Sequence, residues 1–401
     1  LQWGTAPGYL KFGAKFTGRE KTSDLSSDVY DGFDGTLTLD EVSRGGPDGF
    51  KDSVRPYYTF GPRVDYGAAE SVFGSERNAF ERSDGDSLEN SLADDYEVEE
   101  DVTAAYLMAG GTFGELDVVA GVRVEQTDAT FAAYDLVFED GDLSSDLVLR
   151  RGENDYTNTL PGLHLRYSLL PDVDVRFAYT NTIGRPEYVD LAPRRVFEID
   201  PDGAVFEGTV EEGNPALRPL ESRNFDASVE WYLRPAGLVS VGLFHKSIDN
   251  PIYARTTELE DAVFEGRPFS ELTILRPENA DRGRLTGVEL NYQQPFQGLP
   301  ALLDVFGISL NYTYTDGRAT LFDRDEDVPF FLQPEHTGNA ALYYEKRGFE
   351  ARIAYTFRSE YLDEVADDAE QDVYVDGRAQ LDFKASYAFN PQWRVFLEVL
   401  N

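Results

Sequence analysis

Alternation of apolar and polar residues with a period of two, in segments of about ten residues, runs along most of the chain. In one such segment the two sets are Phe349, Ala351, Ile353, Tyr355, Phe357 and, between them, Arg352, Thr356, Arg358. Successive side chains of a β-strand point to opposite faces, so the alternation predicts strands with one apolar face. The chain is therefore expected to be all-β.

The alternation predicts about thirteen strands, separated by connections of two kinds. The strands lie near residues 8–20, 97–112, 115–127, 154–169, 173–183, 222–233, 237–248, 283–294, 304–315, 336–345, 349–360, 376–388 and 393–401. Short connections alternate with long ones, and the long ones cover about 21–96, 128–153, 184–221, 249–282, 316–335 and 361–375. An antiparallel up-and-down barrel in an outer membrane has tight turns on one side and long loops on the other. A soluble sandwich or propeller also has alternating strands, but strict short–long alternation over so many hairpins favours the barrel.

Composition narrows the choice of function. The chain has no cysteine, so a disulfide or a thiolate metal site is excluded. A net charge of −38 disfavours nucleic-acid binding, because a phosphate backbone needs a basic surface. No run of 18 apolar residues predicts a transmembrane helix. The first residues, Leu1–Gly4, lack the pattern of a signal peptide, so a mature or truncated start is expected.

A strand that spans the membrane must keep its charged side chains out of the hydrocarbon. We expect one set of apolar residues to face lipid: Val118, Ala120, Val122, Phe177, Ile353 and Phe383. The alternate set is expected to face the lumen: Arg123, Arg176, Arg352 and Lys384.

The sequence gives little support for catalysis or for a metal site. The histidines, His164, His245 and His336, are far apart in predicted strands, and no local signature of a catalytic nucleophile accompanies them. The acidic clusters in 323–327 and 363–376 lack the spacing of a calcium-binding loop and are expected to be solvated. No enzyme activity, cofactor or metal is predicted.

Several segments carry more specific motifs. In Gly213–Pro219, followed by Asn224-Phe225-Asp226, Pro215 and Pro219 cannot donate to a β-ladder, so this segment belongs to a loop approaching a strand. It resembles the segment that re-enters the barrel in TonB-dependent receptors, especially the branch found in Caulobacter-like and Xanthomonas-like bacteria. Further segments similar to that family are Asn158–Tyr167, Thr182–Tyr188, Gln333–Asn339, Arg358–Tyr361 and Leu397–Asn401.

The resemblance implies a 22-stranded transmembrane barrel, occluded by an N-terminal plug that follows a TonB box. Residues 1–401 then correspond to the barrel domain truncated at both ends, without the plug and the last strand, and resemble strands nine to twenty-one. The implied function is TonB-energised uptake of a scarce nutrient across the outer membrane of a Gram-negative bacterium. The implied partners are outer-membrane lipid and lipopolysaccharide, the TonB complex through the missing N-terminal part, and a small ligand. A passive porin-like barrel is an alternative.

Two predicted outer loops have the composition of a ligand site, because aromatic faces stack on sugar rings and charged groups hydrogen-bond hydroxyls. The candidate ligand-binding residues are Arg185, Glu187, Tyr188, Asp190 and Arg195 in one loop and Tyr57 and Tyr58 in the other. Residues 21–96 hold 17 acidic and 7 basic side chains, which disfavours an anionic ferric siderophore complex. An oligosaccharide is therefore the expected cargo, and a ferric siderophore is the alternative.

Overall fold

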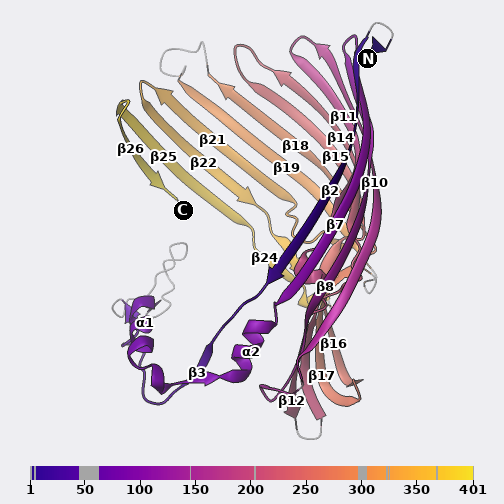
Figure 1. The fold of residues 1–401 in the computed structure, drawn as a ribbon. Helices are drawn as coiled ribbons and strands as arrows, with labels where there is room; N and C mark the ends of the chain where they lie inside the picture. Colours follow the sequence, from indigo (N-terminus) through magenta and orange to yellow (C-terminus); the bar gives the residue numbers. More distant parts are fainter. Residues whose placement is uncertain are drawn as a thin grey trace.

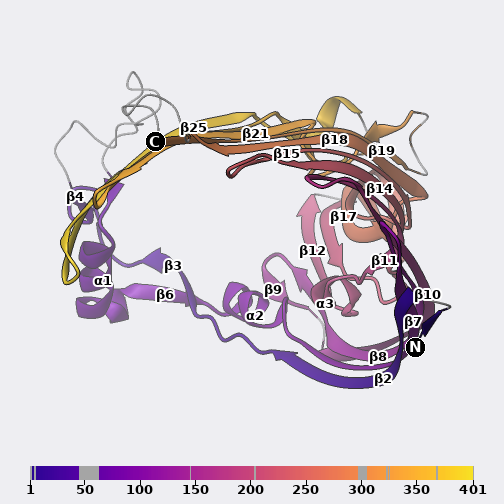
Figure 2. The same ribbon diagram turned by 90° about the horizontal axis from the view of Figure 1, so that it is seen from above.

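Thirteen long strands form one strongly curved antiparallel sheet (Figures 1 and 2), and each strand pairs with the next along the chain. The computed structural model describes residues 2–3, 6–44, 63–144, 146–202, 205–296, 305–321, 324, 326–366 and 369–400. The strands are β2 (Ala6–Ser23), β7 (Tyr96–Phe113), β8 (Leu116–Glu139), β10 (Val148–Leu170), β11 (Val173–Gly184), β14 (Leu220–Tyr232), β15 (Leu238–Asp249), β18 (Arg282–Pro295), β19 (Phe306–Thr320), β21 (His336–Lys346), β22 (Phe349–Arg358), β25 (Arg378–Asn390) and β26 (Trp393–Val399).

Each strand predicted from alternation corresponds to one of these thirteen, so the predicted fold class is confirmed. Two strands are much longer than predicted. β8 and β10 have 24 and 23 residues and pair with each other as far as Asp135 and Val148. Their outer halves were expected to be loop, but the register of the two strands continues without a break.

The connections are sorted between the two ends of the sheet. Tight turns join β7 to β8 through Gly114 and β21 to β22 through Gly348, and both glycines have positive φ, a conformation that glycine adopts at low cost. The three α-helices of the described residues lie at the opposite end, where Figure 1 labels α1 and α2, within long connections: α1 (Tyr66–Ser75), α2 (Asp84–Leu92) and α3 (Tyr188–Leu191). No helix in the described ranges is long and apolar enough to cross a membrane.

The register shows that the two predicted sets of wall residues lie on opposite faces. One row of paired residues crosses seven strands, through Arg176, Ser228, Gly242, Glu289, Thr313, Thr337 and Arg358. Pairing of Arg166 with both Arg176 and Asp117 extends this face to β8, and pairing of Arg352 with Lys384 extends it to β25. Arg123, Arg176, Arg352 and Lys384 therefore share one face, and Phe177, Ile353 and Phe383 lie on the other.

The charged face is the concave one. Tyr188 of α3 donates a hydrogen bond to Glu100 of β7, and α3, β12 and β17 lie inside the curve of the sheet (Figure 2). Glu100 pairs with Ala129 of β8. Ala129 is an even number of residues from Arg123, so Glu100 and Arg123 lie on the same face of the sheet. On the convex face Phe12, Phe16, Leu243 and Ile353 are exposed. An apolar convex face and a charged concave face match a barrel wall between lipid and lumen.

A four-stranded branch of the same sheet caps the end that carries the long connections. It extends β8 through β12 (Arg195–Asp202), β13 (Val205–Glu212), β17 (Arg267–Asn279) and β16 (Ile252–Phe264). The β8–β12 and β13–β17 pairs are parallel and join residues from different long connections. Its core is formed by Phe197, Ile199, Val210, Phe269 and Leu272. The prediction of loops over 184–221 and 249–282 was therefore wrong in this respect, and we call this structure the cap sheet.

Shorter elements complete the long connections. They are β1 (Gln2–Trp3), β3 (Val29–Phe33), β4 (Ser43–Arg44), β5 (Arg63–Val64), β6 (Phe80–Ser83), β9 (Asp142–Leu143), β20 (Val328–Pro329), β23 (Tyr361–Glu364), β24 (Val373–Val375) and 3-10 helices at Arg77–Ala79 and Ala369–Gln371. A further apolar core packs the last connections together, with Tyr253, Ala319, Leu321, Leu362 and Val365 among its members. The long connections are thus largely folded structure.

Candidate ligand-binding site

A cavity of about 380 Å³ lies where the outer ends of β2 and β7 face the segment that follows β11. It is lined by Arg19, Lys21, Tyr96, Glu100, Arg185, Pro186, Glu187, Tyr188 and Val189. Five of these residues come from the Arg185–Val189 segment, and the other four come from strands that lie far from it in sequence. We call this cavity the rim cavity.

Local sequence explains why the chain turns into the rim cavity after β11. Pro186 has no amide hydrogen to continue the ladder, and β11 ends two residues earlier at Gly184. The short helix α3 follows and buries Leu191 and Ala192 in an apolar core with Val98, Phe131 and Leu217. This packing holds the α3 segment against the concave face of β7 and β8.

Arg185 is held by two acidic side chains of the wall. Its Nη2 lies 2.6 Å from Oε2 of Glu125 and its Nε lies 3.9 Å from Oε2 of Glu100. Only 4% of the Glu100 side chain is exposed, so its charge requires partners. Arg19 Nη1 supplies a second cation 3.0 Å from Oε1 of Glu100, and the Tyr188 hydroxyl donates to the same oxygen at 3.2 Å.

Among the cations that line the rim cavity, Arg19 and Arg185 make ion pairs, whereas Lys21 contacts aromatic rings. Its Nζ lies 5.5 Å from the ring centroid of Tyr96 and 5.7 Å from that of Tyr188, within the range of cation–π attraction. No carboxylate lies within ion-pair distance of Lys21 in the part of the chain that the structure describes. The ammonium group can therefore attract an anionic or hydroxyl-bearing ligand without losing an existing ion pair.

The structure brings together three of the seven residues predicted from sequence: Arg185, Glu187 and Tyr188 all line the rim cavity. Asp190 is half-buried in α3, and burial, followed by the nearby charge of Glu187, raises the pKa of its carboxyl. Tyr57 and Tyr58 lie outside the described residues.

Arg195 lies apart from the rim cavity, in the cap sheet. It is buried at the start of β12, with its Nε 2.9 Å from Asp135 and its Nη1 2.6 Å from Glu265. The hydrogen bond from Arg195 is the main reason why the pKa of Glu265 is lowered. Arg195 thus joins β8, β12 and the β16–β17 turn.

Four cavity residues were missed by the sequence reasoning: Arg19, Lys21, Tyr96 and Glu100. Arg19 and Glu100 were assigned to predicted strands, and Lys21 and Tyr96 to the ends of the predicted connection 21–96. One signal was available, because the four basic residues of β2 (Lys11, Lys15, Arg19, Lys21) all have odd numbers and hence share one face. This face is the concave one, since Arg19 pairs with Glu100.

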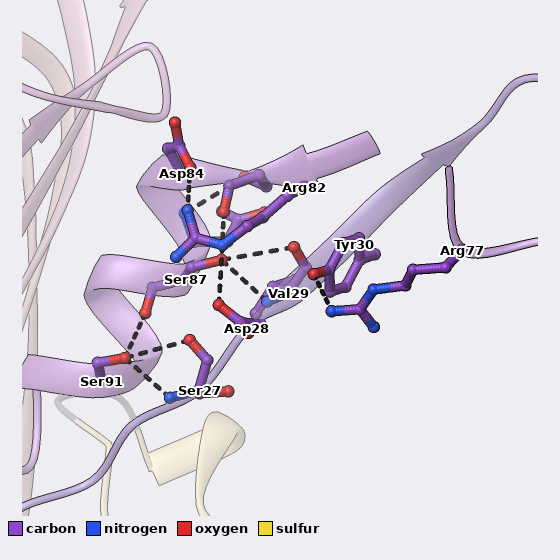
Figure 3. Close-up of polar contacts among 11 residues, drawn as sticks. Ser27, Asp28, Val29, Tyr30, Arg77, Arg82, Asp84, Ser87 and Ser91 are labelled. Atoms are coloured by element: carbon purple, nitrogen blue, oxygen red, sulfur yellow. Dashed lines mark hydrogen bonds and ion pairs between the residues drawn. The ribbon is translucent and has the colours of Figure 1, made fainter. Parts of the chain in front are cut away.

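In the first long connection, hydrogen bonds attach the segment after β2 to α2, as Figure 3 shows in close-up. The amides of Leu25, Ser27 and Val29 donate to Asp95 Oδ1, Ser91 Oγ and Ser87 Oγ, at 2.8, 2.9 and 2.9 Å. Ser87 and Ser91 are four residues apart and therefore lie on one side of α2. Together these bonds attach residues 25–29 along α2, and we call them the serine ladder.

Aromatic and charged contacts fix the far end of this connection. The Arg77 guanidinium lies 4.2 Å from the ring centroid of Tyr30 and 4.3 Å from that of Phe73, and it donates to the Tyr30 hydroxyl. Phe73 also meets Phe80 edge to face at 5.0 Å. Arg82, seen in Figure 3 between Asp28 and Asp84, makes an ion pair with each.

The histidines are separated in space as they are in sequence. Nδ1 of His245 lies 2.7 Å from the Thr286 hydroxyl, and Nδ1 of His336 lies 2.8 Å from the Tyr312 hydroxyl. His164 has the same parity as Arg166 and belongs to the concave face. Within the described ranges no group of His, Asp and Glu is arranged to hold a metal ion.

Comparisons with solved structures identify the same architecture. The ferric-catecholate import receptor Fiu from K12 E. coli matches with a TM-score of 0.59 and 13% identity over 100% of this chain and 48% of that one. The ferric citrate transporter FecA matches with a TM-score of 0.56 and 14% identity over 98% and 46%, respectively. The siderophore receptor PiuA from Acinetobacter baumannii gives 0.53 and 11% over 98% and 48%.

These likenesses show the fold, and the chain spans about half the length of the structures it matches. Comparison with curated protein sequences gives no match. The family model described as "TonB dependent receptor-like, beta-barrel" matches residues 1–401. The chain therefore belongs to the TonB-dependent receptor family, within its β-barrel region.

Proposed function

We propose that this chain forms much of the wall of an outer-membrane receptor that binds a small nutrient outside the cell and imports it with energy delivered through TonB. The observation that carries the proposal is the rim cavity on the concave face, at the end of the sheet that bears the cap sheet. A ligand held there lies between the outer loops and the lumen. The narrower likeness to the Caulobacter-like and Xanthomonas-like branch stays a prediction.

The proposed binding residues are Lys21, Tyr96, Tyr188, Arg185 and Glu187. Lys21 and the two tyrosines supply the contacts to the ligand, because the ammonium group and both rings face one another across the cavity. Arg185 positions Tyr188 through their shared partner Glu100. In this proposal Asp190 and Arg195 support the loop and the cap sheet.

The charges of the concave face favour an anionic cargo, such as a metal chelate that carries carboxylate or catecholate groups. All four basic residues of β2 face the concave side, and Lys21 has no anionic partner within ion-pair distance in the described ranges. Three structural matches are described as receptors or transporters of iron chelates or siderophores, but at 11–14% identity they support only the fold. The choice of cargo therefore rests on the charges of this chain.

A neutral oligosaccharide is the second candidate. The acidic composition of residues 21–96 disfavours an anion at the outer face, and tyrosine rings beside hydrogen-bonding groups suit a sugar. A passive porin-like barrel would need neither the rim cavity nor an energy source. These alternatives make different predictions for one experiment.

The experiment uses the full-length receptor in cells and in purified form. Binding of a panel of ferric carboxylate and catecholate chelates and of maltodextrins is measured, followed by uptake with and without a proton gradient. We expect an anionic chelate to bind, uptake to stop when the gradient is dissipated, and Lys21→Gln to weaken binding about fivefold or more, as loss of one charge-assisted contact implies. Lys11→Gln, on the same face of β2 but ten residues away, is the matched control. Uptake that continues without the gradient contradicts the proposal, as does an equal effect of both variants.

A further inference from the structure

The convex face of β14, β15, β18 and β19 carries a row of arginines near its outer end. Arg223 on β14 pairs with Ser247 on β15, Ser247 pairs with Arg284 on β18, and Arg284 pairs with Arg318 on β19. All three arginines are exposed. They lie on the convex face because Arg223 is two residues from Phe225, which pairs with Tyr179 on the same face as Phe177.

This position is unusual for cations, because the same face becomes apolar two register rows further along the strands. One register row below the arginines lie Phe225, His245, Thr286 and Asp316. The next row holds Leu243, Val288 and Tyr314. Arginine side chains two rows above an apolar and aromatic band occupy the level at which lipid headgroups meet the hydrocarbon.

A groove of about 520 Å³ runs beneath the arginine row. Its convex-side lining consists largely of apolar and aromatic side chains, namely Phe177, Phe225, Ala227, Leu243, Val288 and Tyr314. His245 and Thr286 lie at its outer end and are hydrogen-bonded to each other. Asp316 also lines that end, but Arg318 Nε lies 3.3 Å from its Oδ1 and offsets its charge. The groove thus joins an apolar floor to a cationic outer edge.

The three arginines differ in how far they are already engaged. Arg223 Nη2 lies 3.2 Å from Asp249 Oδ2, and this pair is about half exposed on both sides. Arg318 is paired with Asp316 in a similarly exposed arrangement. The side chain of Arg284, at the centre of the row, makes no ion pair or hydrogen bond with any residue that the structure describes. Arg284 is therefore the cation of the row whose charge is left for an external anion, and such an anion would also lie close to Arg223 and Arg318.

We propose that this surface binds a phosphorylated acyl lipid of the outer leaflet. The phosphate group contacts Arg284 and is flanked by Arg223 and Arg318, while an acyl chain lies in the groove over Ala227 and Val288. A soluble phosphate does not explain the groove, and an uncharged lipid does not explain the arginine row. The proposal relies on the outer-membrane placement in the proposed function and is independent of the cargo.

The test uses the full-length receptor in phosphatidylcholine nanodiscs that contain either diphosphorylated lipid A or its dephosphorylated form, without cargo. Native mass spectrometry measures the lipid that the receptor retains on release. The charge variant is Arg223→Gln, Arg284→Gln and Arg318→Gln combined, and the groove variant is Ala227→Trp. Lys246→Gln is the matched control, because Lys246 neighbours Ser247 on β15 but faces the lumen. Heat-modifiable migration on gels verifies that each variant is folded.

We expect the unaltered receptor and Lys246→Gln to retain the phosphorylated lipid, and the charge variant to retain it at least about tenfold less, since each basic side chain near a membrane surface contributes roughly a fivefold gain. The groove variant should also retain less of it. Equal retention of the two lipid forms by the unaltered receptor overturns the proposal, as does undiminished retention by the charge variant. Cargo uptake by the same proteins is scored separately, so failure of the transport proposal is distinguishable from failure of this one.

Discussion

Nη2 of Arg185 lies 2.6 Å from Oε2 of Glu125, which joins the segment entering α3 to the concave face of β8. The Arg185 side chain is 29% exposed and that of Glu125 is 11% exposed. An ion pair this sheltered is more sensitive to loss of one partner than an exposed surface pair is. It determines where Tyr188 lies relative to Lys21.

Replacement of Arg185 should therefore lower both stability and ligand affinity. For Arg185→Gln we expect a loss of about 2 kcal/mol in the free energy of unfolding, typical of a hydrogen bond between charged groups. Urea unfolding of the full-length receptor in lipid vesicles measures it. A double-mutant cycle with Glu125→Gln should give a coupling of about 1 kcal/mol or more. Strictly additive effects would contradict the role assigned to this pair.

The rim cavity predicts different outcomes for two residues of the same short helix. Tyr188→Ala removes a ring that faces Lys21 and should weaken ligand binding about tenfold, since an aromatic partner of a cation contributes about 1 kcal/mol or more. Asp190→Asn should leave affinity nearly unchanged, because Asp190 does not line the cavity. Isothermal titration with the cargo found in the panel measures both. If Asp190→Asn weakens binding as much as Tyr188→Ala, the site extends to the other side of α3.

The serine ladder predicts a local effect on the first long connection. Ser87 is buried, and its Oγ accepts the amide hydrogen of Val29. In Ser87→Ala that amide loses its acceptor, at a cost of about 1–3 kcal/mol. Hydrogen exchange of residues 25–30 should accelerate, while exchange in the cap sheet stays unchanged. Ser71→Ala is the control, because within the described residues the Ser71 hydroxyl donates to a carbonyl of its own helix, α1. Equal acceleration in both variants would mean that the ladder does not hold this segment.

The contact between α2 and the cap sheet should weaken as the pH rises. Burial and then the nearby charge of Glu198 raise the pKa of Glu89, and Asp86 and Glu211 add to the effect. Arg194 partly offsets these charges, because it makes ion pairs with Glu211 and Asp94. A raised carboxyl pKa means that the docked state holds its proton more tightly than the undocked state. Below the usual glutamate pKa, Glu89 is protonated in both states and its burial does not weaken the docking of α2. As the pH rises through the raised pKa, Glu89 becomes charged and the docked state loses stability.

Hydrogen exchange of α2, corrected for the intrinsic pH dependence, measures this effect. Protection should fall as the pH rises above the usual glutamate pKa in the unaltered receptor and stay constant in Glu89→Gln. Glu70→Gln, on the exposed side of α1, should behave like the unaltered receptor. A pH dependence that persists in Glu89→Gln would assign the effect to another group.

The wall could be predicted from sequence because its signal is local. In β22, for example, the alternation of apolar and polar residues from Phe349 to Arg358 indicates which face of the sheet each side chain lies on. The cap sheet could not be predicted in the same way, because β12 pairs with β8 and β13 pairs with β17 across separate connections. Apolar and polar residues alternate in Arg195–Ile199, but this segment was interpreted as part of a binding loop. The ion-pair partners of Arg195 in the structure, Asp135 and Glu265, lie in other segments.

The candidate site was partly predictable for a related reason. Arg185, Glu187 and Tyr188 follow a recognisable strand end, so a motif points to them. Lys21 and Tyr96 become cavity residues only because β2 and β7 are paired from Ser23 and Tyr96 inward, which brings the outer ends of both strands together. A 72-residue connection, from Asp24 to Asp95, separates the two strands. Their pairing therefore cannot be predicted from the alternation within a segment of ten residues.

We expect the convex face of the sheet to meet lipid and the concave face to meet the lumen. The chain has no cysteine of its own. A single cysteine introduced at Phe177, Ile353, Arg176 or Arg352 is therefore the one residue of this region that a maleimide can label. Labelling of the full-length receptor in outer-membrane vesicles with a water-soluble maleimide compares adjacent positions on the same strand. We predict rapid reaction at 176 and 352 and little reaction at 177 and 353, which a lipid-soluble reagent should reach instead. Equal reaction of the water-soluble reagent at all four positions would contradict the account.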